Sequence, residues 1–344
     1  MPVLASLSGR ALSVYGAGNA SRIQDVFSTT LYTGNGGTQT ITNNIDTLGK
    51  GGLVWIKSRS LVAGHRFTDT ARGVTKSLDS VTTAGEATES TGLTAFGTTG
   101  FTIGADADYN TNAATYVSWA FREQSKFFDI VTYTGTGANR TIPHGLGDVP
   151  GCIIIKRTDA TAALWPVYHR GLANTEYIVL NSQGLKNTSG TTFWNSTTPT
   201  DSVFSLGTNA AVNASGGTYV AYLFAHNAGG FGTSGTDNVI SCGTYLGNNH
   251  RSQEVVQLGF EPQWVMLKNA TTNTTHWVMV DNKRSMIASG GNGWLRASET
   301  NAESAITTDR VVAAPTGFYF DSLQTDINGL NDTFIYIAIR RSSL

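Results

Sequence analysis

Apolar residues fill both faces of the stretch TYVAYLF, residues 218–224, when it is divided with a period of two. A period of two predicts a β-strand, because successive side chains of a strand point to opposite faces of a sheet. Both faces are mostly apolar, with Thr218, Val220, Tyr222 and Phe224 on one and Tyr219, Ala221 and Leu223 on the other. Two apolar faces are typical of a central strand that is covered on each side. We therefore expect residues 218–224 to lie inside a sheet that is packed on both faces.

The same pattern occurs three times along the chain. The stretches NTNAATYVSWAF (110–121), NASGGTYVAYLFA (213–225) and NGLNDTFIYIAI (328–339) each place an Asn five residues before the Thr or strand start. Each copy also has an upstream Tyr-x-Gly, an apolar run that ends in Lys, and a short strand that contains Phe101, Phe204 or Phe318. The distance from this Tyr to the final strand is 89, 91 and 94 residues in the three copies. Similarity at a fixed period indicates an internal repeat.

The repeat predicts three tandem domains behind an N-terminal arm. We place the arm at residues 1–24 and the domains at 25–124, 125–231 and 232–344. Each domain has about seven or eight strand candidates separated by Gly- and Asn-rich turns, and none shows a stripe of period 3.6. This pattern indicates an all-β chain of three β-sandwich or jelly-roll-like domains.

Composition agrees with β-structure and narrows the partners. Charged residues make up 14% of the chain, below the typical value of about 25%, and Thr, Ser, Asn and Gly supply most of the polar surface. The net charge of −1 and the lack of a Lys/Arg run predict no nucleic-acid partner. Apolar stretches are strand-sized, so we expect no membrane insertion. The first residues lack a basic segment and Arg10 interrupts their apolar run, which predicts assembly in the cytoplasm.

Cysteine and histidine positions predict neither a metal site nor a cofactor. Cys152 and Cys242 have no second thiol or His at ligand spacing, so we expect two free thiols, with a disulfide between them as the alternative. The six histidines show no spacing that would hold a metal through one element. His65, His169 and His276 lie near the same strand of the three copies, but at positions that do not match.

No motif for catalysis is present in the sequence. Glycan hydrolysis needs two carboxylates at a defined separation, and no candidate acid recurs in all three copies. The candidates are Asp69, Glu86, Glu89, Asp201 and Asp281, of which Glu86 and Glu89 are expected to be solvated loop residues. A nucleophile elbow and a phosphate-binding loop are also missing. We therefore expect a protein that is not an enzyme.

Two kinds of cation do recur in the copies. Lys57, Lys156 and Lys268 end the first long strand, and Arg72, Arg170 and Arg284 follow about 15 residues later. These cations either cap strand ends, cover the edge of the core or pair with a local acid, or they contact a neighbouring subunit or an acidic glycan. Asn110, Asn213 and Asn328 are expected to form turns through side-chain bonds to nearby backbone.

Two tryptophans are candidates for stacking on sugars. Trp165 and Trp194 would offer this surface if they were exposed, and burial in a core or a domain interface is the alternative.

The first two copies resemble a repeat domain of tailed bacteriophages. The resemblance rests on VWIKSR (54–59), DTARGVTKSL (69–78) and TYVSWAF (115–121) in the first copy, and on HGLGDVPGCIIIKR (144–157), VYHRGL (167–172) and NASGGTYVAYLFA (213–225) in the second. It implies a virion structural or tail-fibre-like protein, often of marine or aquatic phages, with no known catalytic residue. The third copy departs from the pattern, with DNKRS and a final strand that ends in IAIRR.

Residues and resemblance together predict a non-catalytic virion protein that is assembled in the host cytoplasm and contributes to assembly and host attachment. Residues 1–24 would anchor the chain to other virion proteins, and the domains would form a homo-oligomer, with a trimer favoured. The alternatives are a glycan-binding adhesin that recognises a host surface glycan, a capsid decoration protein and a polysaccharide depolymerase.

Overall fold

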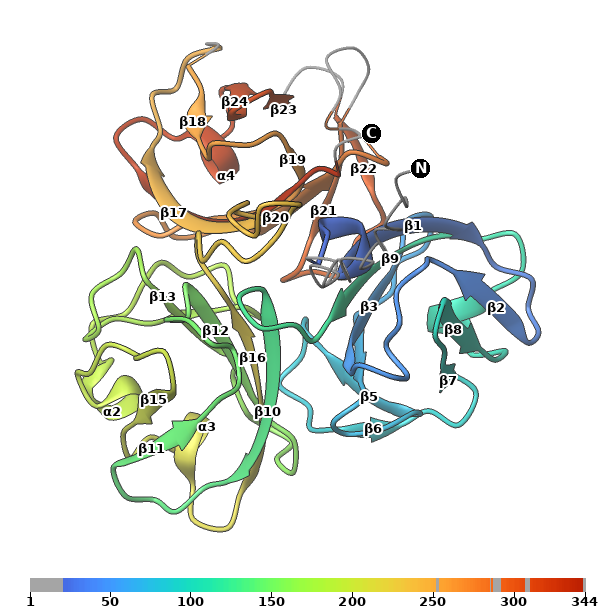
Figure 1. Cartoon of the computed structure of the whole chain (residues 1–344), viewed down its shortest axis with the longest axis horizontal. Helices are drawn as coiled ribbons and strands as arrows, with labels where there is room; N and C mark the ends of the chain where they lie inside the picture. The colour runs from blue at the N-terminus through green and yellow to red at the C-terminus, as the bar shows by residue number, and fades with distance from the viewer. Residues whose placement is uncertain (1–20, 252–253, 285, 287–291, 307–309, 343–344) are drawn as a thin grey trace, which may run out of the picture.

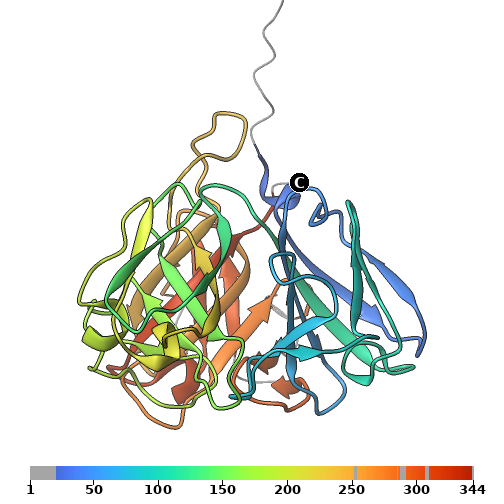
Figure 2. The same cartoon turned by 90° about the horizontal axis from the view of Figure 1, so that it is seen from below.

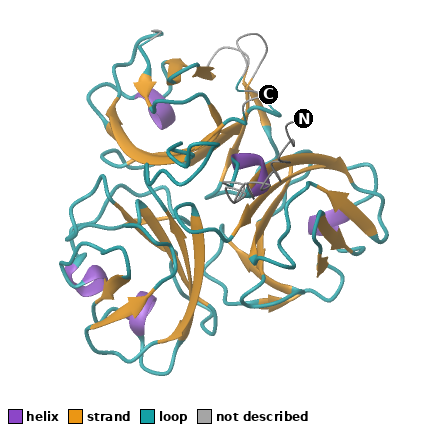
Figure 3. Cartoon of the chain, in the orientation of Figure 1, coloured by secondary structure: helices purple, strands orange, loops and turns teal. Residues whose placement is uncertain are grey.

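Antiparallel sheets form nearly all of the regular structure (Figure 3). The computed structural model describes residues 21–251, 254–284, 286, 292–306 and 310–342. Within these ranges the helices are η1 (Ile23–Asp25), α1 (Ala107–Asn110), α2 (Thr191–Trp194), α3 (Ala210–Asn213) and α4 (Thr325–Asn328). None of these helices has the length and apolar character needed to cross a membrane. The predicted all-β class is confirmed.

Three large sheets share one strand arrangement, and each belongs to one unit of the molecule. In the first unit the order is β1 (Phe27–Thr33), β9 (Thr115–Arg122), β3 (Gly52–Ser58), β4 (His65–Asp69), β5 (Lys76–Asp79) and β6 (Ala87–Thr88). In the second unit it is β10 (Phe128–Thr134), β16 (Thr218–Phe224), β12 (Cys152–Arg157), β13 (Pro166–His169) and β14 (Ile178–Val179). In the third unit it is β17 (Ile240–Leu246), β25 (Thr333–Arg340), β19 (Pro262–Asn269), β20 (Trp277–Asp281), β21 (Asn292–Arg296) and β22 (Ser304–Ile306).

A small sheet covers one face of each large sheet and makes the units sandwich-like. The first unit has β2 (Gln39–Thr42), β8 (Gly100–Ile103) and β7 (Leu93–Phe96), and the second has β11 (Arg140–Pro143) and β15 (Val203–Leu206). The third has β18 (Val256–Gln257), β24 (Gly317–Asp321) and β23 (Arg310–Ala314). Phe101, Phe204 and Phe318 occupy the same place in β8, β15 and β24, since they pair with Ile41, Ile142 and Val256.

The period of two divides the central strands of the first and third units between two cores. In β19, Val265 and Leu267 belong to the core of the third unit, whereas Trp264 and Met266 belong to a core that all three units share. In β3, Val54 and Ile56 likewise face the small sheet of their own unit. The strand predicted at 218–224 is β16, which lies between β10 and β12 and is buried except at Thr218. The expectation of a central strand with two covered faces is confirmed.

Aromatic rings from three large sheets meet in the shared core. The ring of Phe121 lies 5.7 Å from that of Phe224 and 5.8 Å from that of Trp264, centroid to centroid. Phe27 and Phe128 contact the same group at 4.9 Å and 5.4 Å from Phe121. The three units therefore surround a common axis, as Figure 1 shows. Burial of the face of each large sheet that points toward this axis depends on the other two units.

The repeated Asn holds the end of each unit together. Asn213, the last residue of α3, accepts a hydrogen bond from the Thr136 amide at 2.9 Å and donates to the carbonyls of Ala138 and Gly207, both at 2.7 Å. Asn110 and Asn328 make corresponding bonds in the other two units, and all three residues are buried. These bonds join the turn after the first strand to the short helix and to the segment that precedes it. The predicted bonding to nearby backbone is confirmed at a carbonyl six residues upstream of each Asn, whereas the bonds to the first turn were not predicted.

The repeated Tyr-x-Gly completes the same clamp. The hydroxyls of Tyr32, Tyr133 and Tyr245 donate to the carbonyls of Tyr109, Val212 and Ile327 at 2.9, 2.8 and 2.7 Å. A Cβ atom on Gly135 would collide with the Ala214 carbonyl, so only glycine permits this approach of the two turns. The motif that repeats most clearly in the sequence is therefore a structural clamp.

Replacing Asn213 by Ala is expected to lower the free energy of unfolding by about 2–3 kcal/mol, because buried backbone groups lose their partners. Urea unfolding followed by tryptophan fluorescence measures this loss. Asn139→Ala is the control, since Asn139 is exposed and bonds only to the Asn195 side chain; its effect should stay within about 0.5 kcal/mol. Equal losses in the two variants would contradict the clamp.

Candidate functional site

The repeated lysines lie at the interfaces between neighbouring units, which we call seams. Lys156 is buried, and its Nζ donates to the Ala163 carbonyl of its own unit at 2.7 Å and to the Thr83 carbonyl of the first unit at 3.1 Å. Lys57 bonds to the carbonyls of Ser58 at 2.7 Å and Thr300 of the third unit at 3.3 Å. Lys268 bonds to the carbonyls of Thr275 at 2.8 Å and Gln183 of the second unit at 3.4 Å. Each lysine thus links two units within one chain.

A ring N–H lies beside each lysine and crosses the same seam. Trp165 and Trp277 donate through Nε1 to the carbonyls of Thr82 and Val179, at 3.2 and 2.9 Å. In the first unit His65 occupies this position, opposite Lys57, and its Nε2 lies 3.1 Å from the Arg296 carbonyl. The Nδ1 atom of His65 accepts from Trp55, so Nε2 carries the proton and donates it across the seam.

Two backbone hydrogen bonds complete each seam. Between the first and second units, the Ala163 amide donates to Thr83 at 3.0 Å and the Glu86 amide donates to Thr158 at 2.7 Å. Between the third and first units, the Ala63 amide donates to the Thr300 carbonyl and the Glu303 amide to the Arg59 carbonyl. Between the second and third units, the Thr275 amide donates to the Gln183 carbonyl and the Lys186 amide to the Ala270 carbonyl. Since every unit uses one surface toward the next unit and another toward the previous one, the three seams close a head-to-tail ring.

A buried arginine strengthens the seam between the first and second units. Arg72 contacts Asp69 at 2.6 Å and Glu86 at 3.2 Å, and it donates to the Phe67 carbonyl at 2.9 Å. The hydroxyl of Tyr222, from the second unit, donates to Asp69 at 2.8 Å. The carboxylate of Asp69 therefore accepts bonds from both units.

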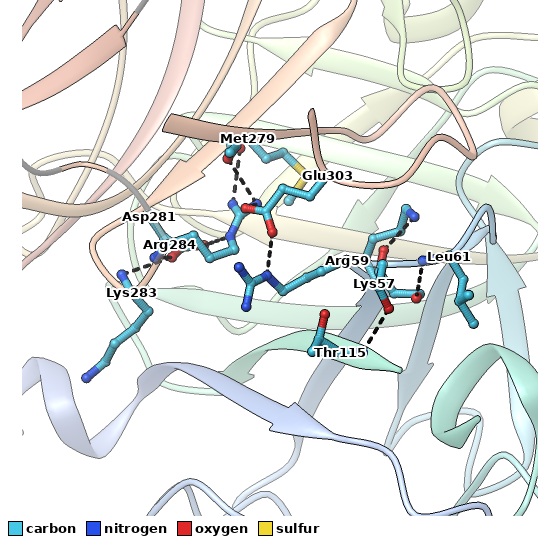
Figure 4. A network of polar contacts seen from close by, with 12 residues as sticks. Lys57, Arg59, Leu61, Thr115, Met279, Asp281, Lys283, Arg284 and Glu303 are labelled. Carbon is cyan, nitrogen blue, oxygen red and sulfur yellow. Dashed lines mark hydrogen bonds and ion pairs between the residues drawn. The ribbon is translucent and has the colours of Figure 1, made fainter. Parts of the chain in front are cut away.

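The seam between the third and first units repeats this arrangement (Figure 4). Arg284 contacts Asp281 at 2.7 Å and Glu303 at 3.4 Å, and the Trp119 indole of the first unit donates to Asp281 at 3.1 Å. Arg59 of the first unit pairs with Glu303. The Arg284 guanidinium also lies 5.4 Å from the centroid of the Trp119 ring, a cation–π distance.

The seam between the second and third units uses a neutral histidine in place of an ion pair. His169 is the counterpart of Asp69 and Asp281, because Cys152, Leu53 and Trp264 pair with these three residues at the same step. The Nδ1 atom of His169 accepts from the Gly171 amide at 3.1 Å, and Nε2 donates to the Tyr336 carbonyl of the third unit at 3.0 Å. Both ring nitrogens are satisfied only in the neutral form.

The predicted equivalence of the three arginines is wrong for Arg170. Arg72 and Arg284 each lie three residues after their aspartate, whereas Arg170 directly follows His169 and Leu172 stands at the arginine position. Arg170 is exposed and donates to His226 at 2.7 Å. Without a carboxylate at His169, no buried acid remains there for a guanidinium to neutralise.

Burial changes the titration of these seam residues. It lowers the pKa of Lys57, Lys156 and Lys268 to about 8, because the charged amine loses water. Burial also lowers the pKa of His169 to about 4. The lysines therefore remain largely protonated donors near pH 7, while His169 remains neutral.

The remaining candidate residues lie as follows. Trp165 and Trp194 are buried and donate to the carbonyls of Thr82 and Glu176, so neither ring presents a face for a sugar. Glu86 and Glu89 are paired with Arg72 and Arg66, which corrects their assignment as solvated loop residues. Cys152 and Cys242 are buried and free, as expected. The described residues contain no group of three or more His, Cys, Asp or Glu that could hold a metal ion.

Arg284→Ala is expected to lower the free energy of unfolding by about 3–5 kcal/mol, because it leaves the Asp281 carboxylate buried without its cation. Urea unfolding measures the change. The control is Arg157→Ala, which removes a partly exposed pair with Asp159 and should cost at most about 1 kcal/mol. A loss for Arg284→Ala no larger than that of the control would contradict a structural role for this ion pair.

Stability should fall in acid through His169. Its folded-state pKa of about 4 lies below the ordinary value of about 6.5, so unfolding takes up a proton between these values. The contribution is fully present above pH 6.5 and is lost as the pH falls toward 4. Between pH 7.5 and 4.5 the unsubstituted protein should lose about 2–3 kcal/mol more than His169→Gln, which keeps a donor and an acceptor but does not titrate. Urea unfolding at both pH values tests this, and equal losses would refute it.

Comparison with known proteins gives a family without an assigned activity. No curated protein matches the chain. One family model, described as Domain of unknown function (DUF7483), matches residues 23–342 and so spans all three units. Because this match covers most of the chain, the protein belongs to the DUF7483 family.

Proposed function

We propose that this protein is a non-catalytic structural component of a bacteriophage virion, associated with the tail, a fibre or the particle surface. In this proposal it is assembled in the host cytoplasm and contributes to particle assembly and host attachment. We also propose that its units are three tandem copies of one jelly-roll-like β-sandwich domain. The motifs shared with tailed-phage repeat domains support both statements.

The observation that carries the structural role is the closed ring of seams. The buried lysines, the Arg72 and Arg284 ion pairs and the ring N–H donors all bond across or beside a seam. Asp69 and Glu86 share Arg72, and Asp281 and Glu303 share Arg284. Groups that are bonded in this way favour a rigid building block over acid–base chemistry.

The N-terminal segment is the proposed anchor to other virion proteins. Of the predicted arm, residues 1–20 lie outside the described residues. Residues 21–24 contact the rest of the molecule, since Ile23 is buried and the Ser342 hydroxyl donates to Gln24 at 3.0 Å. The start and the end of the described chain lie at the same end of the molecule (Figure 2). A segment attached there leaves the other end of the ring free.

A homo-oligomer, with a trimer favoured, is part of the proposal. The surfaces that form the seams are already occupied by other units of the same chain, so a second chain does not bind through them. We therefore assign association between chains to the N-terminal segment or to another virion protein. Neither nucleic acid nor a membrane is proposed as a partner.

Deletion of residues 2–20 is expected to abolish incorporation into particles while the protein stays folded. Residue 20 is the limit because Ser21 accepts a bond from the Gly232 amide and Ile23 is buried. Purified phage particles would be analysed for the full-length and the truncated chain by immunoblot, with circular dichroism and gel filtration as the folding controls. Truncated chain in the particles would refute the anchor, and particles that lack the full-length chain would refute the virion assignment.

A further inference from the structure

The edge between the two sheets of a unit is closed differently in the third unit. In the first unit Gln39, at the start of β2, donates through Nε2 to the Thr33 carbonyl at 3.2 Å. In the second unit Arg140, at the start of β11, donates to the Thr134 carbonyl at 2.7 Å. Each bond ties the small sheet to the end of the first strand of the large sheet.

Glu254 stands at this place in the third unit. Val256 pairs with Phe318 as Ile41 pairs with Phe101, which puts Glu254 in the position of Gln39 and Arg140. A carboxylate accepts hydrogen bonds and has no proton to donate at neutral pH. Among the described residues, no side chain donates to the carbonyl of Leu246, the counterpart of Thr33 and Thr134.

A groove of about 320 Å³ opens at this edge. Its apolar lining includes Tyr245, Phe320 and Leu246, a residue that is 70% exposed. Its polar lining includes Asn248, Gln257 and Glu254, and Asn248 donates to Glu254 at 3.4 Å. Of the described residues that line the groove, Glu254 is the sole charged one.

The groove lies at the end of the unit that is remote from the termini. The first residue of β17, Ile240, pairs with Ile339 near the C-terminal end of the chain, whereas Leu246 pairs with Thr333 at the opposite end of the strand. Seven residues of extended chain separate these ends by roughly 20 Å. A molecule held at its termini would therefore present the groove on its outward side.

We propose that this groove binds one saccharide unit that carries no acidic group, namely a neutral or an amino sugar. The carbonyl of Leu246, the carboxylate of Glu254 and the amide oxygen of Gln257 accept hydrogen bonds from sugar hydroxyls. The exposed side chain of Leu246 offers an apolar surface to the C–H face of the ring. A uronate or sulfated sugar would set its charge beside Glu254 without a cation in the lining, so it is excluded.

This inference rests on the proposed role in host attachment, and its test uses the full-length purified protein. Saturation-transfer NMR would be recorded with the methyl glycosides of glucose, galactose, mannose, N-acetylglucosamine and glucosamine. Methyl glucuronide and arginine amide are the acidic and the cationic comparison probes. We expect a signal from at least one neutral or amino sugar and none from the glucuronide.

The variant that decides the matter is Glu254→Arg, which restores the donor that Arg140 supplies in the second unit. It should bond to the Leu246 carbonyl, close the groove and weaken sugar binding at least tenfold. Gln39→Arg is the matched control, since it replaces one donor by another in the first unit and should leave binding unchanged. Leu246→Thr installs the residue of the other units, removes the apolar surface and should also weaken binding; it decides the test if Glu254→Arg fails to fold.

Three results would overturn the inference. These are no binding of any neutral or amino sugar, binding that survives both Glu254→Arg and Leu246→Thr, and binding of arginine amide or the glucuronide alone. Arginine amide alone would indicate a basic peptide partner. Incorporation into particles is measured separately. A chain that enters virions without binding sugar would refute only the proposed sugar binding. A chain that binds sugar without entering virions would refute only the virion role.

Discussion

Each buried lysine needs carbonyl oxygens from two units, and this requirement holds the three sheets in place. A charged amine that leaves water is stable only when its protons find acceptors. For Lys57, Lys156 and Lys268 one acceptor comes from a loop of the same unit and another from the preceding unit in the ring. Docking the units and satisfying the lysines are therefore one event. Docking of the three units also excludes water from the aromatic core that they share.

Two sets of polar contacts stabilise the fold, one within each unit and one between units. The Asn and Tyr clamp joins segments of one unit, so it recurs in nearly identical form in all three. The seams join different units and differ among themselves, with ion pairs at Asp69 and Asp281 and a neutral ring at His169. The neutral ring of His169 makes its seam sensitive to acid. The third unit departs again at its outer edge, where Glu254 replaces a donor and leaves a groove.

Several features were predictable because they depend on short stretches of chain. The strand at 218–224 and the equivalence of Phe101, Phe204 and Phe318 follow from the period of two and the repeat, and the structure confirms both. Arg170 was grouped wrongly with Arg72 and Arg284 because all three follow the repeated lysine at a similar distance. Arg72 and Arg284 each pair with an aspartate three residues earlier, whereas Arg170 bonds to His226. Glu254 was missed because it lies eight residues after Leu246, whereas Gln39 and Arg140 lie six residues after their strand ends.

The sequence by itself determined the strands, the repeated motifs and the all-β class, because backbone geometry ties these features to periodicity and to local turn residues. Only the tertiary structure decided that the repeated lysines face a neighbouring unit of the same chain, that Glu86 and Glu303 complete ion pairs, and that one edge stays open. These outcomes depend on which distant loops meet when the ring closes. Spacing along the chain does not specify such meetings, since the partners lie on separate loops and several come from another copy of the repeat.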